Sequence, residues 1–120
     1  MLFTKPFILR INQPIMQNEV TNERLTKYFS ITGEAINKIK IAKPINIDWN
    51  NAANDFLNMA KRYFSDAQYF QKQGKIVDAF ACLNYAHGWL DAGARLGLFD
   101  VGGDNRLFTV DKEHVAGLSK

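Results

Sequence analysis

The segment "YFQKQGKIVDAF", Tyr69–Phe80, decides how this chain folds. Gly74 stands where a left-handed cap would end a helix, and helical patterns precede and follow it. A connection as short as "QKQGK" makes two consecutive helices antiparallel neighbours. The segment therefore predicts a helical hairpin with its turn at Gly74.

Apolar residues recur at spacings of three and four on both sides of this turn, which is the pattern of amphipathic helices. The earlier helix is expected from Asp48 or Asn50 to Gln73, and the later one from Ile76 to Leu96, with Gly97 as its stop signal. The expected core stripe of the earlier helix is Ala53, Phe56, Leu57, Ala60, Phe64, Ala67 and Phe70. That of the later helix is Ile76, Ala79, Leu83, Ala86, Leu90 and Ala94.

A third helix is expected upstream, from Thr21 to about Lys43. Thr21 or Asn22 can cap it, and Pro44 ends it because the residue before a proline is pushed out of the α region. Its apolar stripe is Leu25, Phe29, Thr32, Ile36 and Ile39. Residues 21–97 are therefore predicted to form an all-α, up-and-down three-helix bundle.

The ends of the chain are expected to lie outside this bundle. Residues 98–120 contain two short apolar runs around Gly-Gly-Asp-Asn, which predicts a β-hairpin-like or irregular tail that packs on the helices. Residues 1–20 are expected to be an N-terminal extension. Since Met16 opens a stretch that leads directly into the first helix, residues 1–15 are either an extended arm or the product of a misplaced start.

Composition restricts the class of protein. The 120 residues suffice for one domain, and 47% hydrophobic with 22% charged residues is ordinary for a soluble globular protein. One cysteine, Cys82, allows no internal disulfide, and with two histidines it leaves no zinc-finger spacing. Charged residues and prolines interrupt the apolar N-terminus, so it is neither a signal peptide nor a membrane span. We expect a cytoplasmic protein with no cofactor and no membrane partner.

His87, Asp91 and Arg95 are candidate site residues, because they lie one turn apart on a polar face of the last helix. A carboxylate at this spacing can orient an imidazole or share a metal ion with it, but the other histidine, His114, lies in the tail. The simpler interpretation is a surface pair, with Asp91 and Arg95 as an i,i+4 ion pair. We therefore expect no catalytic residues, no metal site and no enzyme.

Gly88 and Gly93 lie inside the same helix, where each costs about 1 kcal/mol relative to alanine. A missing Cβ lets another helix or the returning tail approach closely. Both glycines are therefore expected to be close-packing residues.

The net charge of +3 has its basic excess mainly at the C-terminal end of the first expected helix. The simpler interpretation is that these cations complement the helix dipole and keep the surface soluble. The alternative is weak RNA binding through a basic patch. That patch would comprise Arg24, Lys27, Lys38, Lys40 and Lys43.

The run "LNMAKRYFSDAQYFQKQGKIVDAFACLNYAHGWLDAGARLGLFDV", together with "ERLTKYF" upstream, resembles an archaeal family, domain-of-unknown-function family 357. The resemblance covers roughly residues 21–110, and "YAHGWLDAGARLGLFDV" is its most specific part. It implies a three-helix, up-and-down bundle of archaeal, cytoplasmic origin. It carries over no catalytic residues, because the family defines none.

The leading functional hypothesis is a non-enzymatic module that binds a protein partner or forms a homo-oligomer. It rests on an aromatic-rich bundle with small-residue faces and no convergent polar site. Nucleic-acid binding is the alternative, and an enzyme built on His87 and Asp91 is the weakest hypothesis.

Overall fold

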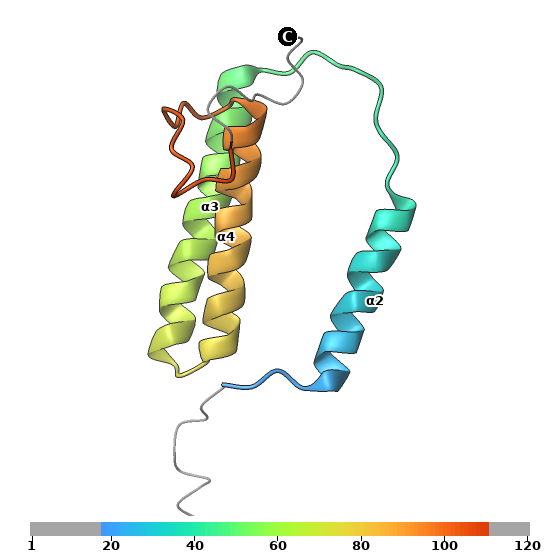
Figure 1. Ribbon diagram of the computed structural model, residues 1–120, viewed down its shortest axis with the longest axis vertical. Coiled ribbons are helices and arrows are strands. Elements are labelled where there is room, and N and C mark those ends of the chain that lie inside the picture. Colours follow the sequence, from blue (N-terminus) through green and yellow to red (C-terminus); the bar gives the residue numbers. More distant parts are fainter. Residues whose placement is uncertain (1–17, 111–120) are drawn as a thin grey trace, which may run out of the picture.

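The computed structural model describes residues 18–110, which contain three α-helices running up, down and up (Figure 1). They are α2 (Asn22–Lys38), α3 (Trp49–Lys72) and α4 (Ile76–Leu96). The predicted all-α, three-helix fold is confirmed. Most of the expected N-terminal extension, residues 1–17, and the end of the tail, residues 111–120, lie outside the described residues.

Helix α2 begins at its predicted cap but ends early. Oγ1 of Thr21 accepts a hydrogen bond from the backbone N–H of Arg24 at 3.1 Å, which satisfies an amide of the first turn. The helix stops at Lys38, short of the expected Lys43, and the backbone is already extended at Ile39 (φ −64°, ψ 139°). Pro44 is therefore not what ends it. Because α2 packs on no other described helix, nothing offsets the low helix propensity of β-branched residues at this end.

Helices α3 and α4 form the predicted hairpin. Asp48 caps α3 by accepting a hydrogen bond from the N–H of Asn51 at 3.0 Å. The chain turns at Gly74 (φ 75°), and the N–H of Lys75 donates to the carbonyl of Phe70 at 3.0 Å. Positive φ is readily adopted only by glycine, so this turn depends on the residue that predicted it.

The line of contact between α3 and α4 consists of small residues. Ala60 and Ala67 on α3, and Ala79 and Ala86 on α4, are buried. Members of each pair are seven residues apart, two helical turns, and therefore share one face of their helix. The large side chains expected in the core flank this line instead. Three of them remain between 42% and 52% exposed, namely Phe64, Ile76 and Leu83.

Helix α2 stands apart from the α3–α4 hairpin, which differs from the packing expected of a bundle (Figure 1). No Cα atom of α2 lies within 8 Å of a Cα atom in α3 or α4. An ion pair between Nη2 of Arg24 and Oδ1 of Asp78, at 2.7 Å, links α2 to the start of α4. The order of the helices is thus as predicted, while close packing is limited to α3 and α4.

Residues 97–110 fold back beside the C-terminal end of α4 as a series of turns (Figure 1). The hairpin-like alternative for the tail is wrong for these residues, which contain no strand, and the irregular alternative is the one observed. The reason lies in the backbone groups that a hairpin would pair. The carbonyl of Leu107 and the N–H of Thr109 bond to side chains of α4 instead. Leu98 and Val110 are buried, so the tail extends the core at this end.

Candidate functional site

An apolar groove runs along one side of the α3–α4 hairpin. It consists of two hollows of about 530 Å³ each, which share Phe64 and Leu83 and therefore form one continuous depression. The alanines of the helix contact lie at its base. The large apolar side chains that line it, which we call the apolar groove, are Leu57, Phe64, Ile76, Phe80, Leu83 and Leu90.

The groove exists because small residues hold the helices close together while large residues stand on either side. Phe80 is 64% exposed, which is unusual for a phenylalanine beside a core. Polar side chains occur at the edges of the groove, including Lys61 and His87. An exposed apolar depression with a polar rim is typical of a protein-interaction surface.

Helix α2 carries a second unpartnered apolar surface. Phe29 and Ile36 are 71% and 67% exposed, and no residue of α2 is buried. We call the exposed residues on this face the α2 stripe: Leu25, Tyr28, Phe29, Ile36 and Ile39. The sequence predicted most of this stripe as core, but in the structure these side chains are exposed.

The opposite side of the hairpin is closed by aromatic rings in edge-to-face contact. Phe56 meets Trp89 with ring centroids 4.9 Å apart, and Tyr63 meets Tyr85 at 4.5 Å. Such pairs contribute beyond their buried area. A hollow of about 300 Å³ remains beside Gly88, Tyr85 and Trp89. This side thus has most of its large rings paired with one another, unlike the apolar groove.

The predicted polar face holds the tail. Oδ1 of Asp91 accepts the N–H of Thr109 at 2.9 Å, and Oδ2 accepts its hydroxyl at 3.1 Å. Nε2 of His87 lies 2.7 Å from the carbonyl oxygen of Leu107, and 3.7 Å from Oδ1 of Asp91. Since a carbonyl only accepts, His87 carries its proton on Nε2 in this contact.

Arg95 lines a hollow of about 350 Å³ together with these residues and the tail. The interactions observed for Asp91 are not with Arg95, as expected, but with Thr109, which bonds to both carboxylate oxygens. The structure therefore brings the three candidate residues together, and two of them position backbone. His87 and Asp91 thus attach the tail to α4, and we call this pair of contacts the clasp.

The two glycines differ in their surroundings. A Cβ at Gly93 would meet the ring of Phe99, falling 2.6 Å from its Cδ2 atom, so the expected close approach is present there. Around Gly88 no described atom lies within 4 Å of such a Cβ, and its assignment as a close-packing residue is wrong. The returning tail crosses α4 at Gly93 and not at Gly88.

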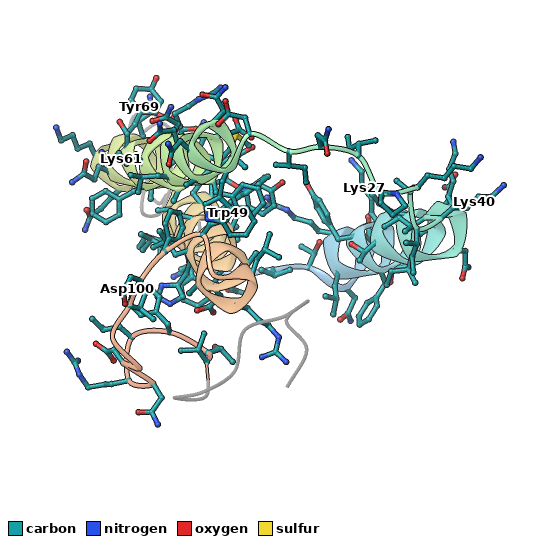
Figure 2. The ribbon with its side chains drawn as sticks, turned by 90° about the horizontal axis from the view of Figure 1, so that it is seen from above. Lys27, Lys40, Trp49, Lys61, Tyr69 and Asp100 are labelled. Carbon is teal, nitrogen blue, oxygen red and sulfur yellow. The ribbon has the colours of Figure 1, made fainter. Side chains whose placement is uncertain are left out.

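The five basic residues are distributed over α2 and the connection that follows it. Arg24 is bonded to Asp78, and this hydrogen bond, with the carboxylate charge, raises the pKa of Arg24 further above its ordinary range. Lys27 and Lys38 each follow an acidic residue by four positions, which places opposite charges one turn apart. Lys40 lies beyond the end of α2 and points away from the hairpin (Figure 2). Lys43 is in the connection to α3.

Cys82 is half-buried, and burial, with a smaller effect of Asp66 and Asp78, raises the pKa of its thiol. A raised pKa disfavours the thiolate, the nucleophilic form. Within residues 18–110 no three His, Cys, Asp or Glu side chains gather as metal ligands would. No helix in that range has both the length and the hydropathy required to cross a membrane.

Sequence reasoning missed the apolar groove because it placed every apolar stripe residue in the core. The predicted core stripe of α4 also omits Phe80. A signal was present: Ile76, Phe80 and Leu83 are spaced by four and three, so they form an apolar edge beside the alanines.

Comparison with known proteins identifies one family. The model of the family described as "Protein of unknown function (DUF357)" matches residues 27–99, more than half of the chain. The match runs from within α2 to just beyond α4, so it includes the whole apolar groove. No curated protein and no solved structure matches the chain.

Proposed function

The chain belongs to the DUF357 family, and we propose that it is a non-enzymatic protein-interaction module that associates with itself. The observation behind this proposal is that two apolar surfaces, the apolar groove and the α2 stripe, lie uncovered in the same chain. Burying apolar surface is the main favourable contribution to protein association. Association that covers one of these surfaces with the other is therefore favourable in free energy.

The use of the polar groups supports a non-enzymatic role. His87 and Asp91 bond to the tail, at the carbonyl of Leu107 and at the N–H and hydroxyl of Thr109. The raised pKa of Cys82 makes it a weak nucleophile at neutral pH. We further infer a cytoplasmic location from the single cysteine, and an archaeal origin from the family resemblance.

Light scattering coupled to size-exclusion chromatography, over a concentration series, tests the proposal. We expect the wild-type chain to be larger than a monomer at micromolar concentration, and Phe80→Asp to shift it toward the monomer by placing a charge in the groove. Asn58→Asp is the matched control, because it adds the same charge at an exposed position of α3. A wild-type chain that stays monomeric up to about 100 μM, a concentration at which even a weak dimer forms, and that captures no partner from lysate would refute the proposal.

A further inference from the structure

We propose that the occupant of the apolar groove is α2 of a second copy of this chain, so that two copies exchange their first helices. This inference rests on the proposed self-association and specifies which surfaces meet. It assigns the α2 stripe as the inserted surface and the apolar groove as the surface that receives it.

The position of α2 directs Phe29 and Ile36, the centre of its stripe, away from its own hairpin. Arg24 reaches Asp78 from α2, which fixes the side of α2 that faces α4. Phe29 and Ile36 follow Arg24 by five and twelve residues, and therefore lie about 140° and 120° around the helix from it, at 3.6 residues per turn. The ion pair thus holds α2 with Phe29 and Ile36 directed away from its own hairpin, in agreement with their exposure. Tyr28, whose ring lies beneath the guanidinium of Arg24, is on the side of the ion pair.

The groove opens on the side of the hairpin away from α2. Figure 2 shows the molecule from above, with Lys61 on one side of α3 and α2 beyond the other side. Lys61 lies at the edge of the apolar groove. Asp78, the partner of Arg24, lies on the other face of α4. Cys82, Tyr85 and Trp89 follow it at spacings of four, seven and eleven residues and therefore share that face. While the ion pair is made, the helix and the groove of one chain therefore lie on opposite sides.

The two surfaces match in length. The groove extends along α3 from Leu57 to Gln71, which at 1.5 Å per residue is about 21 Å. The stripe extends from Leu25 to Ile39, the same number of residues, and all but the last of them lie on α2, so its helical part is about 20 Å long. An amphipathic helix laid into an apolar groove is an established mode of recognition.

The exposed area is sufficient for a stable dimer. Each large apolar side chain offers on the order of 200 Å². With the observed exposures of the stripe and the groove, an exchange that covered these residues completely would bury about 1,000 Å². A two-fold dimer contains two equivalent exchanges and would bury about 2,000 Å², where specific interfaces bury about 1,200–2,000 Å².

A complementation experiment with the full-length chain tests the exchange. Phe29→Asp places a charge in the stripe, and Phe80→Asp places one in the groove, so we expect each variant alone to be monomeric by light scattering. An equimolar mixture should regain dimer, because the first variant retains a working groove and the second a working α2. Circular dichroism should show unchanged helix content in Phe29→Asp, since α2 does not support the hairpin. Asn58→Asp should behave as wild type.

Photocrosslinking decides whether the occupant comes from the same chain. Phe29→p-benzoylphenylalanine is prepared in ¹⁴N and ¹⁵N forms, mixed and irradiated, and the crosslinked peptides are analysed by mass spectrometry. The exchange predicts mixed-isotope crosslinks from position 29 to peptides that contain Phe64, Phe80 or Leu83. The exchange also gives same-isotope crosslinks from dimers of two like chains, so the deciding result is the mixed-isotope product. Crosslinks to these peptides found only within one isotope would instead place α2 in its own groove and overturn the inference.

The outcomes separate this inference from the proposed function. A wild-type dimer in which Phe29→Asp remains dimeric, or in which position 29 does not crosslink to the groove, overturns the exchange and leaves self-association standing. A monomeric wild-type chain without a partner overturns both.

Discussion

Gly93 lies directly beneath the ring of Phe99. A Cβ on Gly93 would fall 2.6 Å from Cδ2 and 3.1 Å from Cζ of that ring, well inside ordinary van der Waals contact. The N–H of Leu98 donates to the carbonyl of Gly93 at 2.8 Å, so the tail returns tightly onto the end of α4. The cost of a glycine inside this helix is thus offset by the close approach of the tail.

Gly93→Ala should therefore destabilise the fold. Overpacking costs about 1–3 kcal/mol, and the better helix propensity of alanine returns about 1 kcal/mol. We expect a net loss of about 1 kcal/mol in the free energy of unfolding, measured by urea denaturation. Gly88→Ala is the control and should gain about 0.5–1 kcal/mol, because no described atom lies near the added methyl group. If both variants are more stable than wild type, the ring of Phe99 does not restrict Gly93.

Asp91→Ala should release the tail from α4. Both oxygens of Asp91 bond to Thr109, and hydrogen bonds to a charged group contribute about 1.5–3 kcal/mol. Hydrogen exchange followed by NMR should show the amide of Thr109 exchanging at least about tenfold faster in the variant, which corresponds to about 1.4 kcal/mol. Arg95→Ala lies one turn away and should leave this amide unchanged. Equal protection of Thr109 in wild type and Asp91→Ala would contradict a clasp.

The turn at Asp104 should weaken in acid. Its carboxylate accepts the N–H groups of Leu107 and Arg106, and these bonds lower the pKa of Asp104 below its ordinary value. Because the charged form of Asp104 is favoured in the folded chain, the stabilisation of the turn by this carboxylate is complete above the ordinary pKa. It is lost as the pH falls through the lowered pKa of the folded state.

NMR titration of the two bonded amides measures this effect. Their chemical shifts should change with a midpoint below about 3.9, the ordinary value for aspartate. Asp104→Asn keeps an oxygen acceptor but does not titrate, so its shifts should be flat over the same range. A wild-type midpoint at or above the ordinary value would disprove the preference for the charged form.

Nucleic-acid binding should be weak. Arg24 is occupied by Asp78, and Glu23 and Glu34 lie one turn from Lys27 and Lys38. Fluorescence anisotropy with labelled RNA and DNA at physiological salt should give dissociation constants no tighter than about 10⁻⁴ M, the weak end of non-specific binding. Tighter binding that falls steeply with salt and disappears in a Lys27→Glu, Lys38→Glu double variant would favour the basic-patch hypothesis instead.

Local signals in the sequence determined the helices and their order. Gly74 and Gly97 adopt the left-handed conformations that mark the ends of α3 and α4, and Thr21 and Asp48 cap α2 and α3 through their side chains. These features depend on a few neighbouring residues and on the backbone freedom of glycine. They can therefore be read without knowing what lies nearby in space.

Tertiary structure decided which apolar residues are covered. Helical spacing alone places Ala79 and Leu83 on one stripe, yet Ala79 is buried and Leu83 is 42% exposed. Spacing shows which side of a helix is apolar, but not how closely another helix approaches it. Likewise, the path of the tail decides that Phe99 covers Gly93 and that Gly88 stays open. Local sequence rules do not determine that path, because contacts between residues distant in the chain set it.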